Sequence, residues 1–201
     1  IKGVGENAIS TIIEERNSQG KFSDVYDFFE RINLNACNRK SLECLILSGA
    51  FDCFEGICRE QYFAETERGG TFLETLVAYG QRYQQEQREQ EMSLFGGFEA
   101  VEIQKPKPPT AYTQWSDLER LNKERNLISI YLSGHPLDDF KLVLDHICTM
   151  RMPHVDDLNS YMNQIVYLGG IVTSVEERTT KRGVPFGKVV IEDFEGPGEL
   201  A

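Results

Sequence analysis

The sequence predicts an α+β protein that is mostly helical and ends in a small antiparallel β portion. Apolar residues recur at helical spacing near the start of the chain, at Ala8, Ile9, Ile12 and Ile13. Such a period is typical of an amphipathic helix. After Gln164 the composition changes to β-branched and aromatic residues separated by glycine turns, which favours strands. We therefore expect helices first and a sheet last.

Capping residues and glycines set the expected order of elements. Ser and Asn begin helices because their side chains accept hydrogen bonds from first-turn amides, whereas Gly and Pro end them. Helices are predicted over residues 6–17, from a cap at Ser23, from a cap at Asn38, over 59–68, over 71–89, from Ser116 to Gly134-His135-Pro136, and over 137–145. Strands are predicted over 165–175 and 187–193, around a turn at Lys181-Arg182-Gly183, with a third strand beginning at the chain end.

Composition divides the chain into four predicted segments. Residues 96–109 are rich in Gly, Lys and Pro, which indicates an extended linker. The predicted segments are a paired-hairpin domain over 1–80, a linker over 81–113, a helical connector over 114–163 and a β portion over 164–201.

The net charge of −11 argues against a strong electrostatic grip on nucleic acid. The charge is uneven along the chain, however. Residues 1–50 carry six Lys/Arg and seven Asp/Glu, whereas residues 51–100 carry four and ten. A contact between DNA and the backbone of the first fifty residues therefore stays open.

Composition also disfavours several classes of protein. No apolar run approaches the roughly 18 residues of a membrane span, and no secretory leader is visible. The five cysteines complete no tetrahedral zinc set, which indicates thiols in a reducing cytoplasm. No nucleophile–base pair or metal cluster indicates a free-standing enzyme, and we expect no cofactor. Because the chain opens at Ile1 and stops in a strand-like stretch, we expect it to be part of a longer polypeptide.

Gly3-Val4-Gly5 fits the helix-hairpin-helix pattern, in which glycines flank an apolar residue between two helices. Glycines permit positive φ angles and close approach of the backbone, so that N–H groups can face a phosphate. The following helix adds the positive end of its dipole. A degenerate second copy is Ser48-Gly49-Ala50-Phe51. The candidate phosphate-binding residues are Gly3, Val4, Gly5, Gly49 and Phe51; a glycine stop between two packed helices is the alternative.

Several stretches, in this order and spacing, resemble the alpha subunits of bacterial DNA polymerase III, the replicative polymerases of the C family. The resemblance covers essentially the whole chain and is most specific at Tyr131-Leu132-Ser133-Gly134-His135-Pro136-Leu137. The other matching stretches are Ile1–Gly5, Asn38–Glu43, Ser48–Asp52, Ser93–Gly96 and Lys181–Gly183. The resemblance implies a fragment of the C-terminal region of a DNA-directed DNA polymerase.

That resemblance implies what the fragment does and what it leaves to the rest of the polymerase. The catalytic aspartates and their Mg²⁺ would lie in a domain upstream of Ile1, so the fragment itself should not polymerise DNA. Its implied partners are DNA, the sliding clamp and other replicative polymerase subunits, in the cytoplasm and away from membranes. Residues 164–201 would be the first part of an oligonucleotide-binding (OB) fold, cut short.

The family carries a clamp-binding peptide at the place of Ser93-Leu94-Phe95-Gly96. Its members use a glutamine, a spacer and a terminal Leu-Phe that fills an apolar pocket on the clamp. Glu91 stands where the glutamine is usual and Gln90 comes one residue earlier, so the motif either has one extra residue or is weakened. Leu94 and Phe95 could instead cover a neighbouring helix. The candidate clamp contacts are Gln90, Glu91, Met92, Ser93, Leu94 and Phe95.

Two further alternatives concern the β portion and the function as a whole. Lys181 and Arg182 lie on a strand-connecting turn, where they could touch single-stranded DNA or form a solvated hairpin tip. The main function predicted is DNA binding and clamp docking within replication. The alternative is a scaffold that positions the polymerase through protein contacts and has little DNA affinity of its own.

Overall fold

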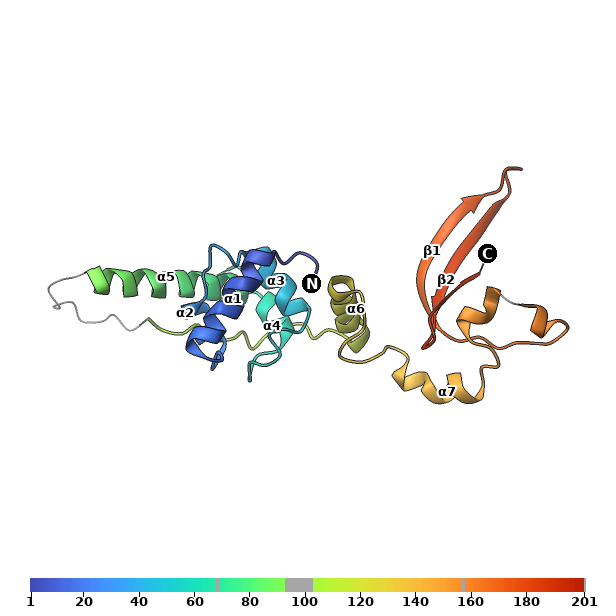
Figure 1. Ribbon diagram of the computed structural model, residues 1–201, viewed down its shortest axis with the longest axis horizontal. Helices are drawn as coiled ribbons and strands as arrows, with labels where there is room; N and C mark the ends of the chain where they lie inside the picture. The colour runs from blue at the N-terminus through green and yellow to red at the C-terminus, as the bar shows by residue number, and fades with distance from the viewer. Residues whose placement is uncertain (68, 93–102, 157, 201) are drawn as a thin grey trace. The chain divides into compact units, whose positions relative to one another are not determined.

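The computed structural model describes residues 1–67, 69–92, 103–156 and 158–200 (Figure 1). More residues of this part of the chain lie in helices than in strands, and one three-stranded antiparallel sheet follows the helices. The predicted α+β class is therefore confirmed. The chain forms two units, Ile1–Leu132 and Ser133–Ala201. The boundary between them lies inside the segment 114–163 that we predicted as a connector.

The first unit is built from helices around one apolar core. Its helices are α1 (Glu6–Gln19), α2 (Val25–Arg31), α3 (Arg39–Leu47), α4 (Arg59–Phe63), α5 (Phe72–Met92) and α6 (Asp117–Ile128). The largest side chains that are almost fully buried in this core are Phe29, Ile32, Leu42, Ile46, Tyr62, Phe72, Leu73 and Leu76.

Of the two predicted caps, Asn38 is confirmed and Ser23 is wrong. Asn38 accepts a hydrogen bond from Ser41 N at 3.0 Å, and Ser116 caps α6 in the same way. The cap of α2 is Asp24 rather than Ser23. The carboxylate of Asp24 accepts from Asp27 N at 2.8 Å, while Ser23 donates its own N–H back to Asp27 at 2.8 Å. Ser23 therefore acts as the hydrogen-bond donor, and Asp24 as the acceptor, in a reciprocal cap.

Two helices are shorter than their sequence patterns predict. The α4 helix ends at Phe63 instead of residue 68, because the chain turns back after it. Ala64 O accepts a hydrogen bond from Phe72 N, and Thr66 N donates one to Gly70 O. The α6 helix ends at Ile128 instead of running to Gly134. There Ser129 takes a left-handed backbone conformation with φ 71°.

A glycine lets α2 and α5 approach each other closely. A Cβ atom on Gly80 would lie 2.4 Å from the carbonyl oxygen of Phe29. One turn further along α5, Gln84 donates to the carbonyls of Phe29 and Ile32 at 3.1 and 2.8 Å. The amide of Gln84 therefore satisfies carbonyls at the C-terminal end of α2, which have no partner inside that helix. This contact sets the position of α5, which runs beside α2 in Figure 1.

The predicted linker is partly helix and partly a tethered segment. The α5 helix occupies its first residues, through Met92. Residues 103–116, which we call the return segment, are extended and hydrogen-bonded to the helices. Tyr26 donates its hydroxyl to Pro106 O at 2.6 Å, and Gln61 donates to Pro109 O at 2.9 Å. The prolines make this segment extended, and the helices hold it in place.

The second unit carries the sheet. Its elements are the 3-10 helices η1 (Asp138–Phe140), η2 (Met152–Asp156) and η3 (Leu158–Tyr161), the helix α7 (Lys141–His146), and the strands β1 (Ile171–Thr179), β2 (Pro185–Glu192) and β3 (Pro197–Leu200). The strands pair antiparallel in the order β1-β2-β3. The predicted strand over 165–175 is wrong for residues 165–170: Tyr167 pairs there with Thr149, and Val166 and Leu168 pack against Met150 and Met152.

The contact at Gly80 predicts a stability change of unusual sign. In a helix interior, alanine is normally more favourable than glycine by about 1 kcal/mol. Here we expect Gly80→Ala to lower the free energy of unfolding by about 1–3 kcal/mol, because its Cβ overlaps the carbonyl of Phe29. Urea unfolding measures the change. The exposed neighbour Gln81 supplies the control, and Gln81→Ala should shift the free energy by less than about 0.5 kcal/mol. A stabilised Gly80→Ala protein would contradict the contact.

Candidate nucleic-acid interface

The first hairpin has one position that requires glycine. Gly3 has φ 84°, and a Cβ atom there would lie 2.7 Å from the sulfur of Cys44 on α3. Val4 is partly buried against the core, as the hairpin pattern predicts for its apolar residue. Lys2 donates its backbone N–H to Leu127 O on α6 at 2.9 Å. The hairpin therefore packs against α3 and is hydrogen-bonded to α6.

Gly5 does not have the positive φ angle that the hairpin pattern led us to expect. It is the N-cap of α1, with an extended backbone at φ −72° and ψ 150°, because its carbonyl already accepts from Ala8 N and Ile9 N. No side chain caps this helix, and a Cβ atom on Gly5 would meet nothing within 4 Å. The first N–H groups of an α-helix have no partner inside the helix. At Gly5, Glu6 and Asn7 they belong to exposed residues.

The second hairpin uses its donors inside the protein. Gly49 has φ 88°, and its N–H donates to Ile46 O while Ala50 N donates to Leu45 O, both at 3.0 Å. These two bonds close the C-terminal end of α3. Phe51 is only 3% exposed and belongs to the core. Gly49 and Phe51 thus end a helix and anchor it, which matches the alternative of a glycine stop between packed helices.

A buried arginine supports the second hairpin, and the sequence pattern had not singled it out. Arg59 is 5% exposed and donates from Nε to Asp52 at 2.8 Å. Its Nη2 lies 3.3 Å from Glu124, a carboxylate on α6 that is 1% exposed. The hydrogen bond to Asp52 is the largest cause that raises the pKa of Arg59 above its usual value. No local sequence signal marks this pair, since 65 residues separate its members.

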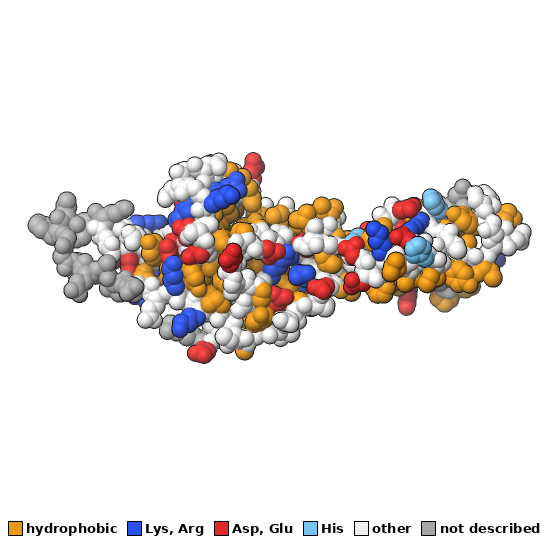
Figure 2. Space-filling model, turned by 90° about the horizontal axis from the view of Figure 1, so that it is seen from below, with side chains coloured by type: hydrophobic (Ala, Val, Ile, Leu, Met, Phe, Trp, Pro, Cys, Tyr) orange, Lys and Arg blue, Asp and Glu red, His pale blue; other side chains and the backbone are white. Residues whose placement is uncertain are grey.

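Several of the arginines around the hairpins are paired with carboxylates. Arg31 binds Glu15 and Asp27, both at 3.0 Å, and Arg39 binds Glu43 and Glu74. On the face drawn in Figure 2, basic and acidic side chains of the first unit are interspersed. The paired arginines would thus add little to the binding of an anionic ligand, which leaves backbone groups and the remaining basic side chains to hold it.

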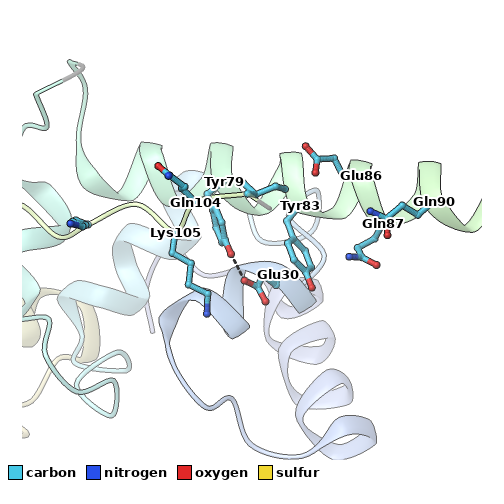
Figure 3. Close-up of a pocket in the computed structure, with 10 residues that line it drawn as sticks. Glu30, Tyr79, Tyr83, Glu86, Gln87, Gln90, Gln104 and Lys105 are labelled. Carbon is cyan, nitrogen blue, oxygen red and sulfur yellow. Dashed lines mark hydrogen bonds between the residues drawn. The ribbon is translucent and has the colours of Figure 1, made fainter. Parts of the chain in front are cut away.

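The candidate clamp peptide starts at the end of α5. Gln90 is exposed on the last turns of that helix, and Glu91 and Met92 complete it. Ser93, Leu94 and Phe95 lie outside the described residues. Gln90 also lines a cleft of about 800 Å³ between α5 and the return segment (Figure 3). At its base Tyr79 donates to Glu30, and burial followed by this hydrogen bond raises the pKa of Tyr79.

Lys181 and Arg182 lie at the tip of the β1–β2 hairpin. Both are exposed, and the turn is closed by a hydrogen bond from Thr180 N to Val184 O at 2.8 Å and by Gly183 with φ 80°. Across residues 1–67, 69–92, 103–156 and 158–200, no group of three His, Cys, Asp or Glu side chains could hold a metal ion. Nor does any helix within those ranges have the length and apolar character to cross a membrane.

Comparison with known proteins finds a matching family model for the hairpin region and similar proteins for the whole chain. A family model described as "Helix-hairpin-helix motif" matches residues 1–62. Three proteins named DNA polymerase III subunit alpha are 34% (Deinococcus radiodurans), 33% (Borreliella burgdorferi) and 30% (Mycobacterium tuberculosis) identical to the chain. The alignments include 100%, 98% and 100% of this chain, in that order. The chain spans only 15–16% of the length of these relatives.

The geometry of residues 1–62 and the family match define a helix-hairpin-helix protein. Every relative named above is a DNA polymerase III alpha subunit and aligns with almost the entire chain. The chain therefore belongs to the DNA polymerase III alpha subunit family, as the resemblance of its motifs predicted.

The two hairpin glycines should differ in what they tolerate. We expect Gly3→Ala to lower the free energy of unfolding by about 2–4 kcal/mol, because backbone strain and the clash with Cys44 add together. Gly5→Ala should lower the free energy of unfolding by at most about 1 kcal/mol, since only a moderate N-cap preference is lost. Chemical denaturation measures both values. Adding Cys44→Ala to Gly3→Ala should recover the part that is due to the clash; equal effects of the two glycine changes would contradict this geometry.

Proposed function

We propose that the first unit binds the backbone of duplex DNA through its first hairpin. The observation that carries this proposal is the open, uncapped start of α1 at Gly5. Because a Cβ atom on Gly5 would meet nothing within 4 Å, there is open space beside the first-turn amides, which can donate to a phosphate while the helix dipole favours its negative charge. Lys2, which is exposed in the same hairpin, adds one positive charge.

The mode of contact follows from the electrostatics. Because Arg31 and Arg39 are already paired with carboxylates, they would add little to the release of counterions when DNA binds. Affinity should therefore be modest and should fall only slightly as salt rises. Such a contact carries no base readout, since phosphate contacts position a protein without reading sequence. It suits a protein that must hold any DNA sequence that passes through it.

Within the alpha subunit, we place this region after the catalytic domain. Metal-dependent nucleotide transfer, with its Mg²⁺, would then belong to another part of the polypeptide, and the fragment would need no cofactor of its own. Its other partners would be the remaining replicative polymerase subunits, in the cytoplasm. We further propose that β1, β2 and β3 begin an OB fold whose exposed hairpin tip, at Lys181 and Arg182, touches single-stranded DNA.

A second proposed function is docking to the sliding clamp through residues 90–95. The supporting observation is that both flanks of this peptide are anchored. The α5 helix packs on α2 through Gly80 and Gln84, and the return segment is bound at Tyr26. A peptide between two anchored flanks loses less conformational entropy when it binds than one on a free linker. Leu94 and Phe95 would supply the apolar contacts.

DNA titration tests the hairpin against the scaffold alternative. We expect the chain to bind a duplex oligonucleotide and Gly5→Val to weaken that binding about tenfold, because the new side chain covers the first-turn amides. Fluorescence anisotropy at two salt concentrations measures affinity and its salt dependence. The exposed Ala50 of the second hairpin gives the matched control, and Ala50→Val should leave affinity unchanged. Wild-type affinity in a folded Gly5→Val protein would refute the contact, and absence of DNA binding at either salt concentration would favour the scaffold.

Substitution of the candidate peptide tests clamp docking. Replacing Leu94 and Phe95 together by alanine should abolish binding to the sliding clamp in surface plasmon resonance, because apolar burial would supply most of the affinity. Glu91→Gln should strengthen binding if Glu91 occupies the glutamine position. If Glu91→Gln has no effect, the clamp reads the peptide from Gln90 or does not read it at all. The exposed apolar residues Leu142 and Val143 provide a matched double-alanine control; equal loss in that control would count against a specific peptide.

A further inference from the structure

A buried carboxylate on α6, that of Glu124, contacts both Arg59 on α4 and the backbone just after α6. Glu124 is 1% exposed. Its Oε1 lies 3.3 Å from Arg59 Nη2, and its Oε2 accepts from the backbone N–H of Leu132 at 3.1 Å. Because the two oxygens are held by donors from different segments, the carboxylate fixes how α6 is rotated about its axis. An apolar side chain could fill the same volume but could accept from neither donor.

On one side, this carboxylate is tied to the second hairpin. Arg59 donates from Nε to Asp52 and from Nη1 to Leu47 O, at 2.8 and 3.3 Å. A Cβ atom on Gly49 would lie 2.4 Å from Arg59 Nη2, so the guanidinium packs directly against the turn. The second hairpin and Arg59 thus form a rigid base for Glu124.

On the other side, α6 is tied to the first hairpin. Leu127 follows Glu124 by three residues, about one helical turn, and its carbonyl accepts from Lys2 N at 2.9 Å. Lys2 directly precedes Gly3, where the chain turns with φ 84°. A change in the rotation of α6 at Glu124 therefore moves the acceptor that holds the first hairpin.

We propose that Glu124 is a positioning residue for DNA binding, which transmits the fixed position of the second hairpin through α6 to the first. The second hairpin would then take part in DNA binding without contacting phosphate itself. This role rests on the phosphate contact proposed above for the first hairpin. Arg59 acts in the same relay, but its removal would leave two carboxylates without their cation, so Glu124 is the better residue to change.

The test compares two glutamate changes on the same helix. Glu124→Gln keeps the volume, but the amide can accept from only one of the donors Arg59 and Leu132. We expect about five- to tenfold weaker duplex binding. Glu119→Gln, on the exposed face of α6, removes the same charge and should leave affinity unchanged or slightly raised. The direction is informative, because losing a negative charge should by itself favour DNA.

Two readouts separate positioning from a general loss of stability. The amide of Lys2 should exchange faster with solvent in Glu124→Gln, while the amide of Leu45 in α3 keeps its protection. In a Gly5→Val background, Glu124→Gln should weaken duplex binding no further, because both act on the same contact. Additive losses, or unchanged affinity in folded Glu124→Gln, would overturn the positioning role.

The outcomes also distinguish this role from the function on which it rests. If Gly5→Val leaves affinity unchanged, the phosphate contact fails and the positioning role fails with it. If Gly5→Val weakens binding and Glu124→Gln does not, only the positioning role is overturned. Should Glu124→Gln unfold, Glu124→Asp retains the charge with a shorter reach, and faster exchange of the Lys2 amide with weaker duplex binding is again expected; wild-type values of both would refute the relay.

Discussion

Aromatic packing around Phe51 joins the second hairpin to two helices of the first unit. Phe51 follows the turn of the second hairpin and is 3% exposed. Its ring lies 4.9 Å from that of Phe28 on α2, 5.3 Å from Phe54 and 5.7 Å from Tyr62 on α4, each in an edge-to-face arrangement. Such pairs add directional attraction to the burial of apolar area. Because the rings come from separate segments, the position of the second hairpin determines where α2 and α4 can lie.

The electrostatics of the first unit explain how a protein of net charge −11 can belong to a DNA-handling family. Three of its arginines join separate elements: Arg31 joins α1 to α2, Arg39 joins α3 to α5, and Arg59 joins the second hairpin to α6. The exposed start of α1 supplies the fixed partial charges that these side chains do not. In the proposed phosphate contact, this geometry would take the place of net charge.

The sequence by itself determined the kinds of elements and much of their order. The first helix, the caps at Asn38 and Ser116, and the turn before β2 all follow from local chemistry: apolar spacing, a capping oxygen, or a glycine with φ 80°. The family also followed from local strings such as Tyr131–Leu137. These features depend on residues close in the chain, so no knowledge of the tertiary packing is needed to find them.

Only the tertiary structure decided which groups meet. It assigned the positive φ to Gly3 and an extended backbone to Gly5, ended α6 at Ile128, and tethered residues 103–116 to the helices. It also brought Arg59 to Glu124. The contact of Gly3 with Cys44, the tether at Tyr26 and the Arg59–Glu124 pair join residues far apart in sequence, and such contacts form only when the core has closed. Local patterns carry no record of these partners, because burial and hydrogen bonding across the core, rather than propensity, select them.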